Sequence, residues 1–379
     1  MSTRDGVAIV GVGTTEFGQL YKDRTANRSA YTLGARAFTA ALEDAGLERD
    51  DIDGLICARL PNYTRMADLV GLRRPSYCQS IDGAGRMSAV AVQLAIGAIQ
   101  SGLARTVALV YGNNGRSAGA TYGGGEDGGP TTGYDTSYGM TSPGAYVALM
   151  YQRYREMYSA PDLALAPLAI NNRAHAMHNE NAVMRTPLTI DDYVNGRYIA
   201  EPLRLFDYCL INDGGVAMIL TSTAIAAKLN RPMVTIRATA SSGDLTNFYT
   251  SDDFFQQSCN SVANRVFSAA GMSTKDVDCV QIYDNFTPTI LFSLEGFGYC
   301  APGTSWDWVR DGRIGLGGEL PVNTSGGHTS ESYMQGWGLH VEAVRQLRGE
   351  AGSRQVPDCE VVQYICASPI TASHLLVRS

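Results

Sequence analysis

The chain has 379 residues, of which 45% are hydrophobic and 18% are charged, and its formal net charge is −7. This composition is typical of a globular protein with a large buried core, and the length suits two domains or one duplicated α/β unit. The acidic balance argues against a nucleic-acid-binding surface, and no apolar run approaches the roughly 18 residues that a membrane span needs.

Eight cysteines are scattered along the chain without a CxxC pair. The N-terminal stretch lacks the apolar segment of a signal peptide and is expected to form the first strand. His175 and His178 lie three residues apart, but no carboxylate or cysteine pattern completes a metal site, so they are interpreted as surface or loop histidines. We therefore expect a cytoplasmic protein with reduced thiols, no metal site and no bound cofactor.

Predicted strands and helices alternate along the chain. Short β-branched runs at 7–13 and 106–114 predict buried strands, while helical spacing of apolar residues predicts helices at 29–46 and 83–102. In the second half the predicted elements are a strand at 234–243, a helix at 260–271, a strand at 279–286, a helix after Tyr333 and a strand at 359–369. The order of elements recurs, although the identity between the halves is too weak to prove a repeat.

Alternation of this kind favours a layered α/β fold with a central sheet. We place the two halves at 1–222 and 233–379, with the boundary in 222–232. The first half includes an inserted region over about 112–212, of which residues 145–212 are expected to be helical.

Residues 112–144 are rich in Gly, Ser, Thr and Tyr and contain few aliphatic side chains. A loop of this length is usually functional or disordered. The tyrosines at 122, 134 and 138 favour an ordered lid or interface loop, with a flexible loop as the alternative. Ser117 matches a GxSxG pattern, but glycines follow where a nucleophile elbow needs a helix, so we assign Ser117 to the loop.

Several dispersed motifs resemble those of sterol-carrier-protein-type thiolases and occur in the same order. They are the segments 80–102, 186–220, 282–300, 323–338 and 364–369. The resemblance covers essentially the whole chain. It implies a thiolase fold, with duplicated βαβαβαββ halves in a five-layered α/β/α/β/α core and an inserted loop region. It also implies a homodimer that acts on acyl-CoA thioesters.

The chain departs from the thiolase pattern at the catalytic positions. Asp82 stands where the nucleophilic cysteine would be, and an ionised carboxylate is a weak nucleophile, so we expect a helix N-cap there. Tyr283 and Tyr333 stand where the family has two active-site histidines. Phenols, with an unperturbed pKa of about 10, suit proton transfer to or from alcohols and enolates. Because position 82 is an aspartate, acyl transfer through the family's usual nucleophilic cysteine is excluded there.

The tyrosine pair is similar to that of the steroid side-chain-cleaving aldolases of actinobacteria, within the thiolase superfamily. This resemblance implies retro-aldol cleavage of a steroid acyl-CoA, of the 17-hydroxy-pregnene-20-carboxyl-CoA type, to a 17-ketosteroid and propionyl-CoA. It also implies a small OB-fold partner related to acyl-CoA-associated domains of hydratases, in a heterotetramer. One tyrosine would deprotonate the alcohol and the other would protonate the enolate, with Tyr333 favoured for the alcohol.

Four further residues are candidates for supporting roles. His328 either orients a tyrosine or the thioester oxygen, or is hydrogen-bonded within its own turn. Asn323 is expected to fix that turn through its side chain. Asp284 is a partner of the neighbouring tyrosine or a structural acid, and Cys366 is an acid/base or an inert buried thiol.

Two other functions stay open from the sequence. An acyltransferase would use another thiol, Cys366 or Cys78, and would form an acyl-enzyme that thiol reagents prevent. A non-catalytic acyl-CoA-binding subunit would instead stabilise a partner protein. A turnover measurement would distinguish the acyltransferase and the non-catalytic subunit from the aldolase.

Overall fold

The computed structural model describes residues 6–18, 29–83, 87–120, 140, 142–243, 249 and 252–379. In the first half the strands of the main sheet are β1 (Val7–Thr14), β2 (Gly54–Ala58), β3 (Tyr77–Ile81), β4 (Thr106–Asn114) and β7 (Asp213–Ser222). In the second half they are β8 (Val234–Gly243), β9 (Cys279–Ile282), β10 (Val361–Cys366) and β11 (Ile370–Arg378).

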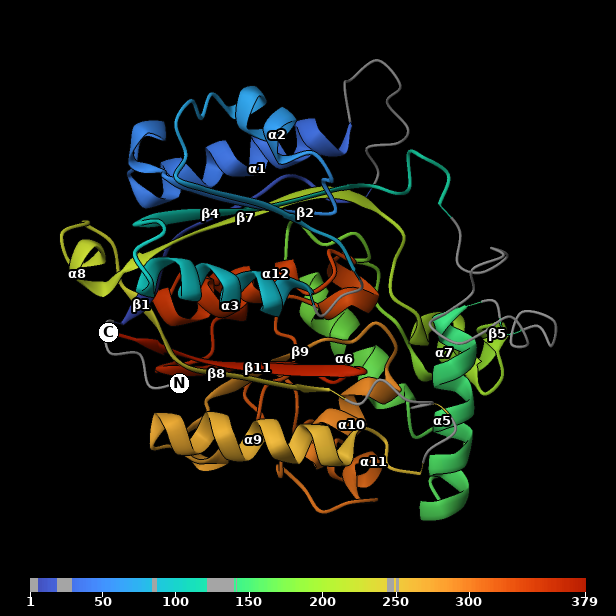
Figure 1. Cartoon of the computed structure of the whole chain (residues 1–379). Helices are drawn as coiled ribbons and strands as arrows, with labels where there is room; N and C mark the ends of the chain where they lie inside the picture. The colour runs from blue at the N-terminus through green and yellow to red at the C-terminus, as the bar shows by residue number, and fades with distance from the viewer. Residues whose placement is uncertain are drawn as a thin grey trace.

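These strands form one sheet in the order β3-β2-β4-β7-β1-β8-β11-β10-β9. Its two parts are joined by a short ladder, because β1 pairs with β8 only through Ala8–Thr235 and Ile9–Val234. The sheet bends at this junction, so that the two parts lie on opposite sides of a central pair of helices (Figure 1). β4 is buried along nearly its whole length, as a continuous apolar run predicts for a strand covered on both faces.

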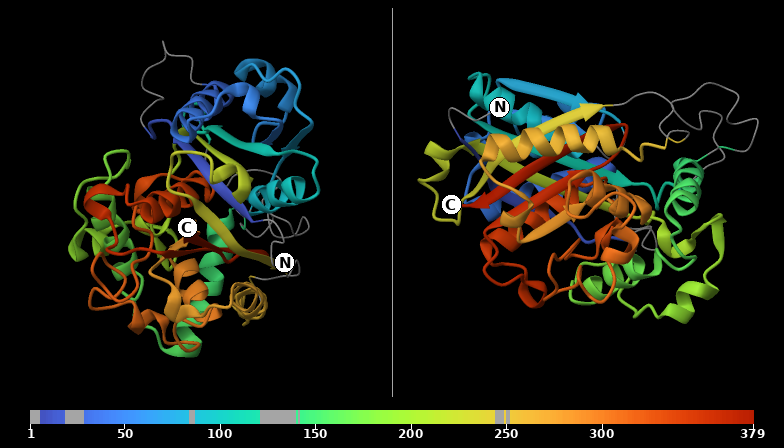
Figure 2. Two further views of the ribbon diagram at one scale, coloured as in Figure 1. Left: turned by 90° about the vertical axis from the view of Figure 1, so that its left-hand side faces the viewer. Right: turned by 90° about the horizontal axis from the view of Figure 1, so that it is seen from below.

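Helices fill the remaining layers (Figure 1). The outer helices of the first half are α1 (Ala30–Ala45) and α2 (Tyr63–Val70), and the central pair is α3 (Met87–Gln100) and α12 (Trp337–Arg348). The outer helices of the second half are α9 (Gln256–Ala270), α10 (Pro288–Gly296) and α11 (Ser305–Trp308). Figure 2 shows α9 lying along β8 and β11. The predicted five-layered α/β/α/β/α arrangement is confirmed.

Glycines in the strands allow α1 to pack directly on the sheet. A Cβ on Gly13 would lie 2.2 Å from the carbonyl oxygen of Ala37, and a Cβ on Gly215 would lie 2.2 Å from that of Leu33. Any side chain at either position would push α1 away from the sheet. β7 ends at Ser222 and β8 begins at Val234, with α8 (Thr223–Ala226) between them in the predicted boundary segment.

The inserted region forms α5 (Pro143–Tyr158), α6 (Ala166–Met177), α7 (Ile190–Asn195) and a small hairpin of β5 (Tyr198–Ala200) and β6 (Leu203–Arg204). Helices were expected over 145–212, and three of them lie between Pro143 and Asn195, whereas the hairpin that follows was not expected. The Gly- and Tyr-rich loop is shorter than predicted, because 112–114 belong to β4. Its tyrosines, at 122, 134 and 138, lie outside the described residues.

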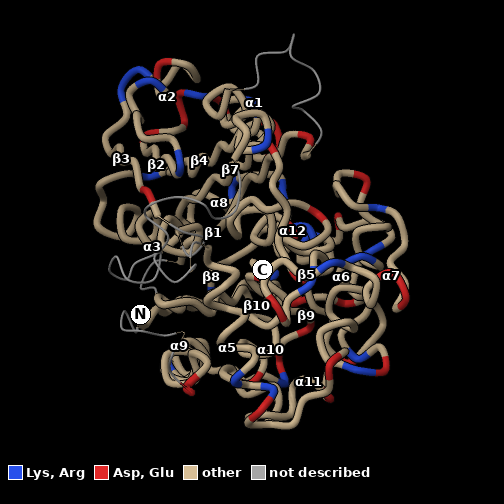
Figure 3. Tube along the Cα trace, turned by 90° about the vertical axis from the view of Figure 1, so that its right-hand side faces the viewer, with Lys and Arg blue, Asp and Glu red and all other residues tan. Residues whose placement is uncertain are grey.

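Acidic and basic residues are interspersed on the face shown in Figure 3, without a continuous basic stripe. No helix of the described segments is long and apolar enough to cross a membrane. Within the same segments, no group of three or more His, Cys, Asp and Glu side chains could hold a metal ion. His175 is not the expected surface residue, since it is buried on α6 and its Nδ1 lies 3.1 Å from the carbonyl oxygen of Asn323.

Candidate active site

Tyr283 and Tyr333 meet although they are fifty residues apart in sequence, and their hydroxyl oxygens lie 2.8 Å from each other. Tyr283 directly follows β9, and its N–H donates to the carbonyl oxygen of Ile365 on β10 at 2.8 Å. The strand predicted over 279–286 therefore ends early, which leaves the phenol at the carboxyl end of the sheet. Tyr283 is buried, whereas Tyr333 is partly exposed.

A tightly folded loop carries Tyr333. It begins at Asn323, which has a φ of 55° and whose Oδ1 accepts a hydrogen bond from the N–H of Ile282 at 2.7 Å. Its turn contains Gly327, with a φ of 60°, where a Cβ would lie 2.4 Å from Asp284 Oδ2. A π-helical turn, Gly327–Glu331, follows. Such turns are rare and occur frequently at functional sites.

His328 lies between the two phenols. Its ring centroid is 4.8 Å from that of Tyr283 and 5.3 Å from that of Tyr333, with edge-to-face geometry in both cases. Its Nε2 accepts a hydrogen bond from the N–H of Gly336 at 3.0 Å, and its Nδ1 lies 3.2 Å from Asp284 Oδ1. Because Nε2 accepts, the proton of the neutral ring is on Nδ1. Nε2 thus bonds to the loop, while Nδ1 faces the Asp284 carboxylate but has no hydrogen-bond partner within the described residues.

Asp284 connects the loop that carries His328 to helix α6 through its two carboxylate oxygens. Its Oδ1 accepts from the N–H of His328 at 2.9 Å, and its Oδ2 accepts from Asn172 Nδ2 at 2.7 Å. The side chain is fully buried. Of the two roles that the sequence left open, the structure therefore places Asp284 as an acceptor that orders the loop and α6.

Two asparagines that the sequence analysis missed hold the site from other elements. Asn172 on α6 also donates to Thr329 Oγ1 at 2.8 Å. Asn212 Oδ1 accepts from the N–H of Tyr333 at 2.7 Å, and Asn212 Nδ2 donates to the carbonyl oxygen of Asp213 at 3.1 Å. Asn212 lies in the segment 186–220, which resembles a thiolase motif, and this resemblance could have identified it as a candidate.

Asp82 lies at the surface, whereas Cys366 lies in the core. Asp82 is exposed, and its Oδ1 accepts from the N–H of Gly83 at 2.8 Å. The expected N-cap role is wrong, because the next residue, Gly83, has a φ of 144° and does not begin a helix. Cys366 ends β10 and is fully buried, with its Sγ 3.8 Å from Ser368 Oγ.

Burial raises the pKa of both tyrosines. For Tyr283 the loss of water is the main cause, and the nearby Tyr333 raises its pKa further. For Tyr333 burial again dominates, Cys209 and Tyr111 raise its pKa further, and the hydrogen bond with Tyr283 lowers it. Both phenols are therefore neutral at physiological pH. A neutral, hydrogen-bonded pair can accept a proton from one side while it releases another on the opposite side.

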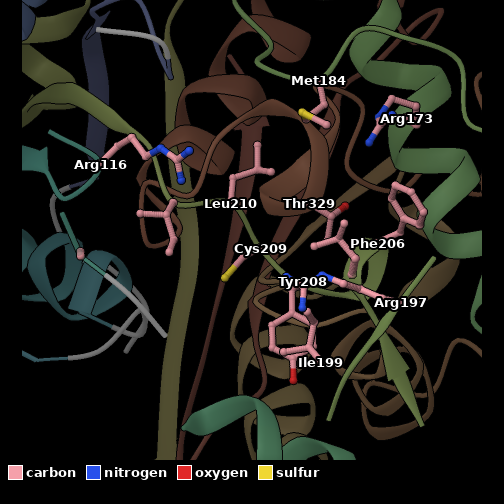
Figure 4. A pocket seen from close by; sticks show the side chains of 13 residues that line it. Arg116, Arg173, Met184, Arg197, Ile199, Phe206, Tyr208, Cys209, Leu210 and Thr329 are labelled. Carbon is pink, nitrogen blue, oxygen red and sulfur yellow. The ribbon is translucent and has the colours of Figure 1, made fainter. Parts of the chain in front are cut away.

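A cavity of about 560 Å³ is lined by Cys209 and by Thr329 of the π-helical turn, although neither tyrosine of the pair lines it (Figure 4). Three arginines line it, with Arg116 on one side and Arg173 and Arg197 on the other. Its apolar lining is formed by Met184, Ile199, Leu205, Phe206, Leu210 and Ile211. Such a cavity suits a ligand that has both apolar and anionic groups.

Arg173 is fixed in the wall of this cavity. The side chain is buried on α6, where its Nε donates to Ser330 Oγ at 3.1 Å and its Nη1 donates to the carbonyl oxygen of Thr186 at 2.9 Å. Ser330 belongs to the π-helical turn beside His328. The cavity wall and the tyrosine loop are therefore one connected structure.

Comparisons with known proteins match this chain along most of its length. Residues 7–224 match the family described as thiolase, N-terminal domain, and residues 240–371 match the thiolase C-terminal domain-like family. A 17-hydroxy-3-oxo-4-pregnene-20-carboxyl-CoA lyase of Mycobacterium tuberculosis is 34% identical over 90% of this chain and 91% of its own. A steroid side-chain-cleaving aldolase of Thermomonospora curvata is 33% identical over 92% of both chains.

Solved structures give the same result for the fold. The Ltp2-ChsH2(DUF35) aldolase superposes with a TM-score of 0.88 at 31% identity and covers 98% of both chains. Human mitochondrial 3-ketoacyl-CoA thiolase, solved with CoA, has a TM-score of 0.73 at 14% identity and covers 100% of this chain and 99% of its own. The second likeness concerns the fold alone.

Proposed function

Because the chain belongs to the thiolase superfamily but has phenols at the two histidine positions, we propose that it is a carbon–carbon lyase acting on an acyl-CoA thioester. Specifically, it is a retro-aldolase that cleaves a steroid side chain of the 17-hydroxy-pregnene-20-carboxyl-CoA type to a 17-ketosteroid and propionyl-CoA. The observation that carries the proposal is the 2.8 Å contact between the hydroxyls of Tyr283 and Tyr333. The names of the relatives at 34% and 33% identity support the same reaction.

The proposed reaction moves one proton from the substrate oxygen to a substrate carbon. Tyr333, the more accessible phenol, accepts the proton of the 17-hydroxyl group as it passes its own proton to Tyr283. The bond between C17 and the side chain breaks, C17 becomes a carbonyl carbon, and the electron pair enters the thioester enolate. As it accepts the proton from Tyr333, Tyr283 releases its own proton to the enolate carbon, which yields propionyl-CoA and leaves both phenols neutral. The relay needs no ionised phenol, which agrees with the raised pKa values of both tyrosines.

The cavity beside Cys209 supplies a place for the thioester substrate in this proposal. Its arginines, Arg116, Arg173 and Arg197, would neutralise phosphate groups of CoA, and its apolar walls would contact the remainder of the substrate. CoA enters as part of the substrate, and the proposed reaction involves no separate cofactor.

We also propose a homodimer that binds a small OB-fold partner, giving a heterotetramer. The support is the solved Ltp2-ChsH2(DUF35) aldolase, whose name includes a second protein, ChsH2(DUF35), and which matches 98% of this chain. A thiol-dependent acyltransferase is less compatible with the site. Cys366 is fully buried, and burial raises the pKa of the Cys78 thiol, which reduces its thiolate fraction.

The test is to incubate the protein, with and without the co-expressed OB-fold partner, with a 17-hydroxy-20-carboxyl steroid CoA thioester and to follow propionyl-CoA by mass. We expect release by the wild type and loss of release in Tyr333→Phe and Tyr283→Phe. Thioester binding without release would favour the non-catalytic subunit. Release that persists in both phenylalanine variants would retain the reaction but refute the tyrosine relay.

A further inference from the structure

Ser117, the serine that matches the GxSxG pattern, is bonded to a buried carboxylate. Its N–H donates to Asp213 Oδ1 at 3.0 Å, and its hydroxyl donates to Asp213 Oδ2. Asp213 begins β7 and is fully buried, whereas Ser117 lies at the surface. A buried carboxylate is unfavourable unless donors satisfy its oxygens, so these two bonds hold the Ser117 turn against the start of β7.

The turn over residues 113–120 has a defined backbone. The N–H of Ala120 donates to the carbonyl oxygen of Gly115 at 2.8 Å. At the start of the turn, Asn113 Oδ1 accepts from the N–H of Gly115 at 3.0 Å, and Asn113 Nδ2 donates to the carbonyl oxygen of Asn212 at 3.0 Å. The turn is therefore closed on itself and attached to the chain just before β7.

This turn forms one wall of the cavity of about 560 Å³. Arg116 and Ala120 line the cavity, and the guanidinium group of Arg116 points into it from the side opposite Arg173 and Arg197 (Figure 4). Arg116 directly precedes Ser117, so the bonds of that serine fix the point from which the arginine enters the cavity. A group that is held in place before binding loses less conformational freedom on binding, which increases affinity.

Two consecutive residues thus hold two different parts of the protein. Asn212 accepts from the N–H of Tyr333 through its side chain, whereas Asp213 accepts from the turn that carries Arg116. A change on the Asn212 side therefore acts on the tyrosine loop. A change on the Asp213 side acts instead on the cavity wall.

We propose that Ser117 and Asp213 position Arg116 to bind a phosphate group of the CoA thioester. The inference rests on the proposed function, in which the cavity holds this thioester. Ser117 and Asp213 are positioning residues that act through the arginine and do not contact the reacting atoms. They determine the affinity for the substrate and leave the rate of carbon–carbon cleavage unchanged.

The first test measures the Kd of CoA by titration calorimetry with the full chain. Ser117→Ala removes the hydroxyl bond to Asp213, and we expect the Kd to rise about tenfold, as for the loss of one hydrogen bond to a charged group. Ser117→Thr keeps a hydroxyl and should retain the wild-type Kd. The matched control is Ser273→Ala, which removes another exposed serine hydroxyl that donates to a carboxylate, at 2.8 Å from Asp276 Oδ2, and does not line the cavity.

A double variant tests whether Ser117 acts through Arg116. Arg116→Gln alone should also raise the Kd about tenfold, and Ser117→Ala should add nothing to it, because the serine then has no cation to position. Propionyl-CoA release gives a second readout. In Ser117→Ala the KM for the steroid CoA thioester should rise with kcat unchanged, whereas the KM for the steroid N-acetylcysteamine thioester, which lacks the phosphates, should stay at the wild-type value.

A wild-type Kd in Ser117→Ala, or effects of Ser117→Ala and Arg116→Gln that multiply in the double variant, would overturn the inference. A lower kcat, or a higher KM for the thioester without phosphates, would also contradict it, because either result indicates a wider disturbance of the site. A wild type that does not bind CoA would refute it as well. If the wild type binds CoA but releases no propionyl-CoA, the aldolase proposal fails while the Kd values still decide the role of Ser117.

Discussion

The most quantitative prediction concerns Glu331, the last residue of the π-helical turn before Tyr333. Its Oε1 accepts from Asn179 Nδ2 at 3.0 Å, and its Oε2 accepts from Ser325 Oγ at 2.7 Å. Burial first, and then the charge of Glu342, raises its pKa from 4.5 to about 7. Hydrogen bonds from Ser325 and Asn179, together with the Arg354 charge, act in the opposite direction.

The sign of the stability effect follows from this raised pKa. The folded protein holds the Glu331 proton more tightly than the unfolded chain does, so this contribution is complete below pH 4.5 and is lost as pH rises through about 7. A pKa shift of that size corresponds to about 3 kcal/mol of unfolding free energy, since each pKa unit corresponds to about 1.4 kcal/mol. Glu331→Gln stays neutral at every pH and keeps a carbonyl acceptor. It should therefore be more stable than the wild type above pH 7 and similar at pH 5.

Urea unfolding of the wild type and of Glu331→Gln at about pH 5 and about pH 8 measures the effect through the change in midpoint. We expect the wild type to lose more stability than the variant over this interval. Glu295→Gln is the matched control, because Glu295 is another buried glutamate that accepts side-chain hydrogen bonds. Equal pH dependence in the wild type and Glu331→Gln would refute the reasoning.

Two further predictions concern the tyrosine pair. Asn212→Leu removes the acceptor for the N–H of Tyr333, so we expect a loss of about 1–3 kcal/mol in unfolding free energy and a lower kcat. Asn212→Asp retains an acceptor oxygen and should recover part of kcat, and equal kcat in Asn212→Leu and the wild type would contradict this role. Because the pKa values of Tyr283 and Tyr333 are raised, kcat should stay flat between about pH 7 and about pH 9. A kcat that increases tenfold per pH unit over that range would instead indicate an ionised phenol.

The sequence predicted those elements whose signal is local. The strands at 106–114 and 234–243 agree with β4 and β8, because buried strands produce short β-branched runs between turns. The helix predicted at 83–102 agrees with α3 over Met87–Gln100, but Gly83 is not helical, because its φ of 144° lies in a region that glycine reaches readily. The strand predicted at 279–286 is confirmed over Cys279–Ile282 and ends early, because the chain leaves the strand at Tyr283.

Part of the site was identified from the family resemblance and the rest had no local signal. Tyr283 and Tyr333 stand in motifs that align with thiolase positions, so their pairing could be expected. The bond between Asn212 and Tyr333 spans 121 residues, and the bond between Asn172 and Asp284 spans 112. Side-chain contacts over such distances depend on the assembled layers, and no periodic pattern in the chain indicates them.

The two halves of the chain, which the short ladder between β1 and β8 joins, contribute different residues to the site. Both Tyr283 and Tyr333 follow β8 in the chain, whereas Asn212 precedes it. A fragment that began at residue 233 would retain the proton-carrying pair but lose the acceptor that fixes the Tyr333 backbone. The duplicated architecture is therefore not two interchangeable units. The second half supplies both phenols and the first half supplies the Asn212 acceptor, so the complete arrangement needs both halves.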